Sequence, residues 1–323
     1  MIRRLVAILA FALAAGTTGA QEPQEIVFGI ISTESTQNLK QEWQPVLDDM
    51  SRKTGYRIKA FFAPDYAGII EGMRFNKVHV AWFGNKSAME AVDRAGAEVF
   101  AQMVNADGTQ GYYSHLIAHR DSGIKNLDDV LKNGKNLSFG NGDPNSTSGF
   151  LVPSYYVFAL NKQDPKTLFK VVRSANHETN ALAVANKQVD VATNNSENLD
   201  KIKERFPDKF AEIRVIWTSP LIPLDPLVMR TDVPPAAKAK IANFFYTYGM
   251  GSQQEKDNLM KLSKLSGFKE SSNRQLIPIR QLELFREKTK LEADTTIAAD
   301  AKAAKLAEYD RQLAELNLQL AQR

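Results

Sequence analysis

Residues 139–150 read FGNGDPNSTSGF and join a short apolar run to an apolar helical run that continues to Leu160. Glycine and proline in the first half predict a tight turn, and three hydroxyl side chains follow it, at Ser146, Thr147 and Ser148. A helix that starts after such a turn exposes unpaired backbone N–H groups and the positive end of its dipole. The stretch therefore predicts a strand, a turn and a helix over 149–160, with neutral donors that suit a tetrahedral oxyanion.

Strand and helix patterns alternate on both sides of this stretch. Apolar runs predict strands in a first series, at 26–31, 57–62, 78–82 and 99–104, and in a second series, at 113–118, 137–139, 169–172, 189–193 and 214–217. One helical pattern between them buries a single face made of Leu39, Trp43, Leu47 and Met50. The alternation predicts an α/β fold in two similar lobes, each with a parallel-rich sheet covered by helices on both faces.

The N-terminus has the features of an export signal. Arg3 and Arg4 precede an apolar run from Leu5 to Ala15, and small residues lead to Ala20. This pattern predicts a signal peptide over 1–20, cleaved after about Ala20, and an exported protein. The chain has no cysteine, which excludes disulfides, thiolate metal sites and a lipid-modified N-terminal cysteine. We therefore expect a soluble protein of the periplasm.

Charge does not indicate a macromolecular partner. Removal of residues 1–20 lowers the formal net charge from +4 to +2, because it takes away two arginines and no acid. Lysines and acids alternate along the rest of the chain without a basic stripe that carries aromatic residues. Binding to nucleic acid is therefore not expected.

The last part of the chain predicts a helical extension over 285–323. From Lys288 onward the composition shifts to Ala, Glu, Lys, Leu and Gln, and Gly and Pro are absent. An apolar stripe with a three-four spacing extends over two heptads, at Leu306, Tyr309, Leu313, Leu316 and Leu320. Such a stripe packs either on its own domain, which we favour, or on a second copy of the chain, because two heptads are short for a coiled coil.

A second group of polar residues lies at the ends of predicted elements. His177 begins a helix after a loop and could donate to the same anion, while Tyr66 and Tyr112 lie in loops beside strand ends. Glu197 follows a predicted strand, and Asp225 lies in a rigid Pro-Leu-Asp-Pro connection. Ligands of α/β sheets bind outside the carboxyl ends of strands, so two carboxylates and two aromatic rings there suit an ammonium group.

Motifs of enzymes and metal sites are scarce. The P-loop, the nucleophile elbow and the His-Glu-x-x-His zinc pattern are absent from the sequence. His115 and His119 have the helical spacing of metal ligands, but their segment is predicted as a strand, so no metal and no cofactor is expected. The alternative among enzymes is a periplasmic hydrolase of phosphoesters or phosphonates, with Ser146 as nucleophile and His177 as base. The sequence offers no metal site and no cationic clamp beside this serine, which weighs against the hydrolase.

Several long motifs resemble one family. GIISTE at 29–34, FFAPDYAGII at 61–70, FGNGDPNSTSG at 139–149, HETN at 177–180 and VATNN at 191–195 are similar to the phosphonate-binding periplasmic proteins of phosphonate ABC transporters. The likeness extends from about Ile26 to Leu284. It implies a two-lobed periplasmic binding fold of the second type, with two strand crossovers as the hinge and a membrane permease as partner. The implied division is 21–112 with 225–284 for one lobe and 113–224 for the other.

The resemblance also implies roles for the candidate residues. Ser146, Thr147, Ser148 and His177 would hold a phosphonate group. Glu197 and Asp225 would meet an amino group, as in 2-aminoethylphosphonate, with Tyr66 and Tyr112 lining the pocket. Phosphate or another oxyanion is the alternative ligand.

Three residues depart from the pattern of the family: His79, where an acid is expected, Phe83, where tyrosine is expected, and Leu224, where glycine is expected. We expect the first two to affect packing. Leu224 directly precedes Asp225, so this third departure could change where the carboxylate of Asp225 lies.

Overall fold

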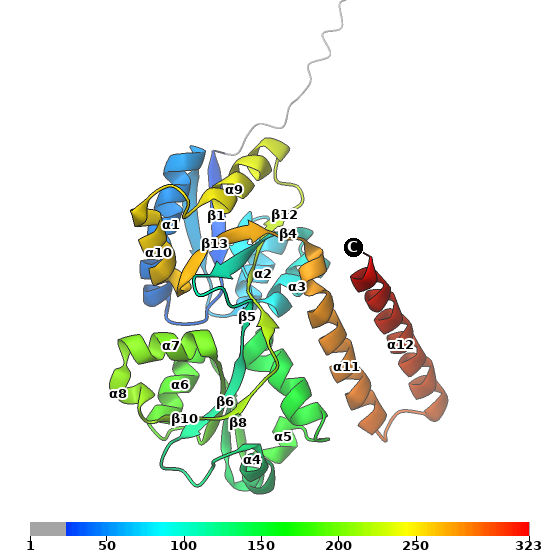
Figure 1. The fold of residues 1–323 in the computed structure, drawn as a ribbon. Coiled ribbons are helices and arrows are strands. Elements are labelled where there is room, and N and C mark those ends of the chain that lie inside the picture. The colour runs from blue at the N-terminus through cyan, green and yellow to red at the C-terminus, as the bar shows by residue number, and fades with distance from the viewer. Residues whose placement is uncertain (1–23, 323) are drawn as a thin grey trace, which may run out of the picture.

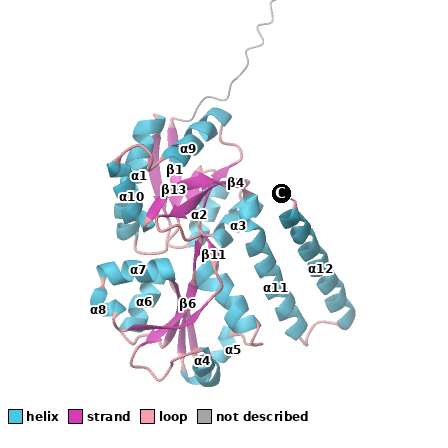
Figure 2. Ribbon diagram, viewed as in Figure 1, coloured by secondary structure: helices cyan, strands magenta, loops and turns pink. Residues whose placement is uncertain are grey.

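The computed structural model describes residues 24–322, which form two lobes around two sheets and a pair of C-terminal helices (Figure 1). The predicted signal peptide, residues 1–20, lies outside the described residues. Strands occupy the centre of each lobe, and helices cover them (Figure 2). Within residues 24–322, no helix combines the length and the apolar character needed to span a membrane.

The sheet of the first lobe has the strand order β13-β4-β12-β3-β1-β2. β1 (Glu25–Ile30) pairs in parallel with β2 (Arg57–Phe62) and β3 (Val80–Trp82). β12 (Pro226–Arg230) pairs antiparallel with β3 and with β4 (Ala97–Asn105), and β13 (Leu265–Glu270) pairs antiparallel with β4. The helices of this lobe are α1 (Thr36–Thr54), α2 (Tyr66–Arg74), α3 (Asn85–Arg94), α9 (Pro235–Thr247) and α10 (Gln253–Ser263).

Helix α1 illustrates how local sequence sets these elements. The Ser35 hydroxyl accepts a backbone N–H of the first turn at 3.2 Å, and Gly55 ends the helix in the left-handed region with φ 76°. The ring of Trp43 lies 5.1 Å from that of Phe28 in β1. The predicted face is buried as expected, at Leu39, Trp43, Leu47 and Met50.

The sheet of the second lobe has the strand order β10-β6-β9-β7-β8. β7 (Ser138–Asn141) pairs in parallel with β8 (Val171–Ser174) and β9 (Val191–Asn195). β6 (Ser114–His119) is antiparallel to β9 and to β10 (Ile213–Thr218). The helices of this lobe are α4 (Leu127–Asn133), α5 (Pro165–Leu168), α6 (His177–Ala185), α7 (Ser196–Arg205) and α8 (Pro207–Phe210).

Every strand predicted from the sequence is present, and each of the two large sheets combines parallel with antiparallel neighbours. Parallel neighbours need a crossover helix between them. β12 instead enters the first sheet directly from the second lobe, and it runs opposite to both of its neighbours, β3 and β4. β6 follows β4 without a helix in the same way and is antiparallel to β9.

The two crossovers expected as the hinge meet in a short ribbon between the lobes (Figure 1). β5 (Gly111–Tyr112) and β11 (Ile222–Pro223) pair antiparallel there. A Cβ atom on Gly111 would lie 2.1 Å from the carbonyl oxygen of Ile222. Glycine therefore allows the two backbones to approach this closely.

The helix predicted over 149–160 forms with a different geometry. The chain is helical from Thr147 to Ala159, but both ends are π-helical, in η2 (Thr147–Leu151) and η3 (Ser154–Ala159). Pro153 has no N–H to donate to the carbonyl of Gly149, and the N–H of Gly142 donates to that carbonyl instead, at 3.0 Å. This hydrogen bond from Gly142 connects the π-helical start of the helix to the loop before it.

The C-terminal helices α11 (Ile277–Ala293) and α12 (Ala299–Ala321) pack against each other. α11 continues unbroken through residue 285, where the extension was predicted to begin, because Ile279 and Leu282 belong to the core of the first lobe. Leu313 of α12 is buried, Leu306, Tyr309 and Leu316 are half-buried, and Leu320 is 42% exposed. Only the centre of the predicted stripe is therefore fully covered within the described chain.

The hinge ribbon provides a test of the fold. We expect Gly111→Ala to lower the free energy of unfolding by about 1–3 kcal/mol, because the added methyl group overlaps the backbone of β11. Urea unfolding of both proteins measures the change. Gly123→Ala is the control, since no atom lies within 4 Å of its added Cβ. A Gly111→Ala protein as stable as the Gly123→Ala control would contradict this account of the ribbon.

Candidate functional site

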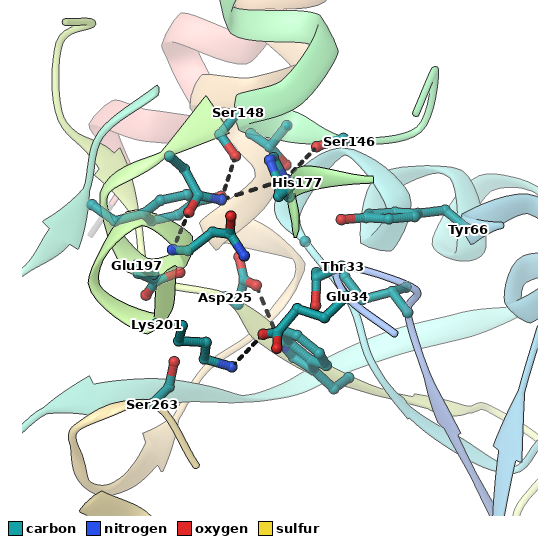
Figure 3. A pocket seen from close by; sticks show the side chains of 17 residues that line it. Thr33, Glu34, Tyr66, Ser146, Ser148, His177, Glu197, Lys201, Asp225 and Ser263 are labelled. Atoms are coloured by element: carbon teal, nitrogen blue, oxygen red, sulfur yellow. Dashed lines mark hydrogen bonds and ion pairs between the residues drawn. The ribbon is translucent and has the colours of Figure 1, made fainter. Parts of the chain in front are cut away.

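A pocket lies between the lobes and is lined by residues of both. Figure 3 shows hydroxyl and imidazole groups at one end of it and carboxyl groups at the other. The structure brings all eight residues predicted from the sequence into its wall: Ser146, Thr147, Ser148, His177, Tyr66, Tyr112, Glu197 and Asp225.

Each of the three consecutive hydroxyl oxygens accepts a hydrogen bond from a different part of the protein. Ser146 Oγ accepts the N–H of Gly149 at 2.9 Å and caps its own helix. Thr147 Oγ1 accepts the N–H of Lys86, from the first lobe, at 2.8 Å. Ser148 Oγ accepts Nδ2 of Asn195 at 3.1 Å. A hydroxyl has one donor hydrogen as well as acceptor sites, so none of these three bonds uses the hydrogen of the hydroxyl group.

Two glycines hold the hydroxyl groups in place. A Cβ on Gly142 would lie 2.4 Å from the carbonyl oxygen of Gly149, so the loop and the helix start can meet here only as glycines. A Cβ on Gly149 would lie 2.8 Å from Ser146 Oγ and 3.0 Å from Cε1 of His177. The backbone at this end is therefore shaped around the side chains that face the pocket.

His177 is the first residue of α6 and is buried. Its Nε2 lies 3.4 Å from Ser146 Oγ and 3.4 Å from Asn195 Nδ2, and its Nδ1 has no partner among the described residues. Burial lowers the pKa of His177 to about 4, although Glu34 opposes this. The imidazole is therefore neutral near pH 7 and can donate one N–H.

The opposite end of the pocket concentrates carboxyl groups. Asp225 Oδ2 accepts Nε1 of Trp82 at 3.0 Å, while Oδ1 has no partner among the described residues. Burial, followed by the nearby Glu197, raises the pKa of Asp225 well above its usual range. Burial also raises the pKa of Glu197 to about 7, although Lys201 opposes this. The positive charge near these two carboxyl groups is therefore too little to keep both of them ionised.

Three hydrogen bonds hold the backbone at Leu224 and Asp225. The carbonyl of Leu224 accepts Nε2 of Gln102 at 3.1 Å and Nε2 of Gln275 at 2.7 Å. The carbonyl of Asp225 accepts the N–H of Met103 at 3.0 Å. The backbone of the connection is thus fixed from three sides. Phe83 is buried, and Nδ1 of His79 accepts the N–H of Val27, so both contribute to packing as expected.

The two tyrosines also line the pocket. Burial raises the pKa of Tyr66 and of Tyr112 well above the usual value, and nearby acids add to the effect. Both phenols therefore stay neutral. Tyr66 opens α2 of the first lobe, and its N–H donates to Asp143 of the second lobe at 3.1 Å. The wall of the pocket is thus made by both lobes together.

Sequence reasoning missed several polar residues that line the same pocket, notably Thr33, Glu34, Asn195, Asn198 and Lys201. The side-chain polar atoms of Asn198 and Oγ1 of Thr33 are buried without a partner among the described residues. A sequence signal was available for Asn195, because the strand ends in the polar residues Thr-Asn-Asn. The structure shows that all three are buried. Lys201 and Glu34 gave no comparable local signal, since they meet across the two lobes.

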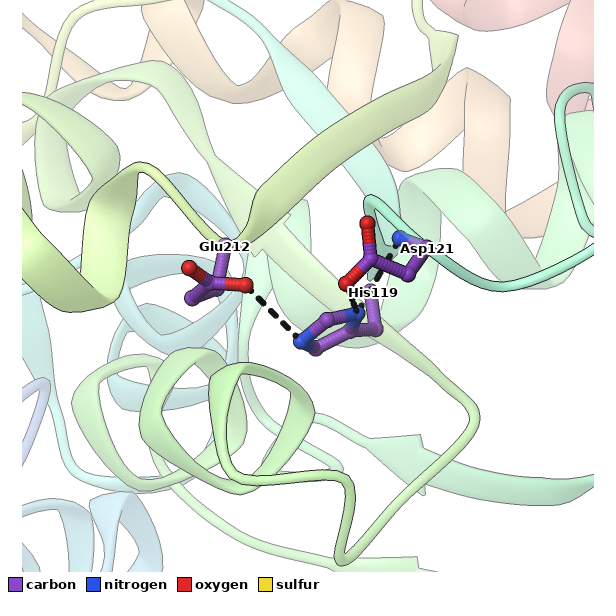
Figure 4. A group of neighbouring side chains, drawn as sticks. All are labelled: His119, Asp121 and Glu212. Atoms are coloured by element: carbon purple, nitrogen blue, oxygen red, sulfur yellow. Dashed lines mark hydrogen bonds and ion pairs between the residues drawn. The ribbon is translucent and has the colours of Figure 1, made fainter.

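A separate cluster has donor types that suit a metal. His119, Asp121 and Glu212 lie close together in the second lobe, outside the pocket (Figure 4). Nδ1 of His119 accepts the N–H of Asp121 at 3.1 Å, and Nε2 faces Glu212 at 3.2 Å. Arg120 and Lys187 also contact these carboxylates. The cluster is therefore satisfied by its own hydrogen bonds and ion pairs.

Comparison with known proteins shows which family the chain resembles. A family model described as "ABC transporter, phosphonate, periplasmic substrate-binding protein" matches residues 28–276. The chain is 56% identical over 297 residues to the phosphonates-binding periplasmic protein of Escherichia coli (strain K12), covering 92% of this chain and 87% of that protein.

Solved structures give the same result for the fold. The binding protein component of an ABC phosphonate transporter from Pseudomonas aeruginosa is 56% identical and has a TM-score of 0.91, over 94% of this chain and 99% of that one. PhnD1 from Prochlorococcus marinus, solved in complex with methylphosphonate, is 19% identical and has a TM-score of 0.72, over 81% of this chain and 97% of that one. The predicted two-lobed binding-protein fold is confirmed.

The raised pKa values predict how stability depends on pH. The folded protein holds protons on Glu197 and Asp225 more tightly than the unfolded chain, whose ordinary pKa values are 4.5 and 3.8. Their stabilising contribution is therefore present below these values and is lost as the pH rises through the folded-state pKa values, about 7 for Glu197.

Asp225→Asn removes one of the two titrating groups and can still accept the Trp82 N–H. Without ligand, we expect this variant to be more stable than the wild type above pH 7, and the advantage to disappear below the ordinary Asp pKa of 3.8. Urea unfolding across this pH range measures the difference. A variant that is less stable than the wild type above pH 7 would contradict the raised pKa of Asp225.

Proposed function

Because the chain belongs to the family of periplasmic substrate-binding proteins of phosphonate ABC transporters, we propose that its ligand is a phosphonate with an ammonium tail, 2-aminoethylphosphonate. As a member of this family it is a periplasmic binding protein that works with a membrane permease. It binds solutes and is not an enzyme, so the hydrolase interpretation of Ser146 and His177 is set aside.

The observation that carries the proposal for the phosphonate end is the hydrogen bonding of the hydroxyl triplet. Ser146, Thr147 and Ser148 each accept one bond from the protein, so each can donate its hydrogen to an oxyanion. The N–H of Ser148 and its neighbours at the start of the helix add to the positive field there. The neutral His177 supplies one further N–H. Together these donors match the several oxygens of a phosphonate.

The acid end supports the choice of an aminophosphonate over phosphate. An ammonium group between Glu197 and Asp225 would supply the positive charge that both carboxyl groups lack, and the unpaired Asp225 Oδ1 would gain a donor. Inorganic phosphate would satisfy the hydroxyl groups but bring no cation to the two acids, so it would gain no ion pair at this end of the pocket. Phosphate or another oxyanion is therefore the rival ligand within the same class of protein.

Binding energy follows from the number of contacts. Hydrogen bonds to charged groups contribute about 1.5–3 kcal/mol each, and association costs about 4 kcal/mol or more. The contacts with the hydroxyl triplet and the two acids therefore exceed the cost by enough for micromolar or tighter binding. We propose that the lobes, 21–112 with 225–284 and 113–224, close around the ligand at the hinge ribbon.

We also propose a second copy of the chain as a partner, through apolar side chains that the C-terminal end of α12 leaves exposed. Leu318 and Leu320 are 65% and 42% exposed there. We expect light scattering to give the mass of a dimer, and Leu318→Glu with Leu320→Glu to give that of a monomer. A wild-type protein with the mass of one chain would contradict this proposal.

Titration calorimetry tests the ligand assignment. We expect 2-aminoethylphosphonate to bind more tightly than methylphosphonate, and methylphosphonate more tightly than phosphate. Ser148→Ala should weaken all three ligands by about tenfold or more, because it removes one bond to the anion. Asp225→Asn should weaken 2-aminoethylphosphonate alone by a similar factor.

Proton exchange gives an independent readout of the same titration. At pH near 7, 2-aminoethylphosphonate should release protons from Glu197 and Asp225, because the ammonium group lowers both pKa values. The release appears as a dependence of the binding enthalpy on the buffer, with methylphosphonate as the control. Tight phosphate binding with no preference for the amine would contradict the assignment.

A further inference from the structure

Helix α7 of the second lobe connects the ligand pocket to the opposite lobe. Glu197 lies in its first turn, and Lys201 and Arg205 follow at four-residue intervals. Residues at this spacing lie on one face of a helix. The same face of α7 therefore carries an acid of the pocket and then two cations.

Both cations contact acids of the first lobe. Lys201 Nζ lies 2.7 Å from Glu34 Oε1 and 2.7 Å from Glu42 Oε2, and the guanidinium of Arg205 donates to both carboxylates. Glu34 follows β1, and Glu42 lies in α1. Their side chains are 2% and 9% exposed, and that of Lys201 is 15% exposed, so salt screens these pairs little. The network therefore forms only while the two lobes are in contact.

Lys201 is also a neighbour of Glu197 in the pocket. Both residues line the same cavity, and Lys201 is the charge that opposes the rise in the pKa of Glu197. A glutamate four residues before a lysine is the favourable order for an ion pair on a helix. In this structure the ammonium group of Lys201 is nevertheless directed to Glu34 (Figure 3). Among the described residues, Lys201 forms no hydrogen bond or ion pair with Glu197; its partners are Glu34 and Glu42.

We propose that Lys201 is a positioning residue that changes its carboxylate partner as the lobes close. In the closed cleft, Glu34 and Glu42 hold its ammonium group, and Glu197 is available to the ammonium group of the ligand. When the lobes separate, Glu34 and Glu42 leave with the first lobe, and Lys201 pairs with Glu197 on its own helix. This inference rests on the proposed function, because it assumes a ligand with a positive tail.

The exchange keeps Glu197 free for the ligand. A ligand with an ammonium group takes the place of Lys201 at Glu197, and the released lysine then strengthens the contact between the lobes. Glu34 and Glu42 therefore support recognition of the amine by holding Lys201 away from Glu197.

The test compares dissociation constants of 2-aminoethylphosphonate and methylphosphonate. In Glu34→Gln with Glu42→Gln, Lys201 stays with Glu197 and competes with the ligand. We expect the preference for the amine to fall by about tenfold, the size expected for losing a bond to a charged group. Adding Lys201→Met to this variant removes the competitor, and the preference should return.

Equal weakening of both ligands in the double variant, or a preference that stays low after Lys201→Met is added, would overturn the inference. The first result would mean that the acids only hold the lobes together. Lys201→Met alone keeps the test decisive if the double variant does not fold: the preference for the amine should be unchanged or higher, and a fall would overturn the inference.

Glu204→Gln is the matched control. Glu204 lies on the same helix and pairs with Lys264 of the first lobe at 3.2 Å, but both side chains are at least half exposed. We expect no change in preference, because exposed pairs contribute little. A wild-type protein without preference for 2-aminoethylphosphonate over methylphosphonate would instead contradict the proposed function, which separates the two failures.

Discussion

Two buried carboxyl groups with too little positive charge around them are the constraint on which this site depends. Glu197 and Asp225 come from different segments, and burial raises the pKa of both. A protein built for stability alone would have placed apolar groups or a lysine between them. The cost of keeping both acids in one pocket is offset only when a ligand supplies a cation, and the selectivity proposed here follows from that requirement.

The opposite end works by a complementary rule, since it offers neutral donors to an anion. The hydroxyl oxygens of Ser146, Thr147 and Ser148 are each held by an N–H group of the protein, and one of these belongs to Lys86 of the first lobe. Both ends of the pocket are therefore completed by contacts between the lobes. This explains how the hinge ribbon at Gly111 can couple lobe movement to the fit of the ligand.

Much of the site was predictable from sequence, because the polar residues directly follow strand ends in an alternating α/β pattern. The eight candidate residues do share one pocket. The mixed sheets were not predicted, because β12 and β13 lie where no local pattern reveals which sheet a strand joins. The π-helical start of the 147–159 segment depends on a bond between Gly142 and Gly149. The ion pairs of Lys201 cross the lobes, and sequence spacing carries no information about them.

A crystal structure of the protein with 2-aminoethylphosphonate tests the central claim most directly. The account predicts that the phosphonate oxygens accept hydrogen bonds from the hydroxyl groups of Ser146, Thr147 and Ser148, and that the amino nitrogen lies between Glu197 and Asp225. A closed complex in which the hydroxyl triplet faces other protein groups, with the ligand bound elsewhere or with its amino group at the triplet, would contradict the account.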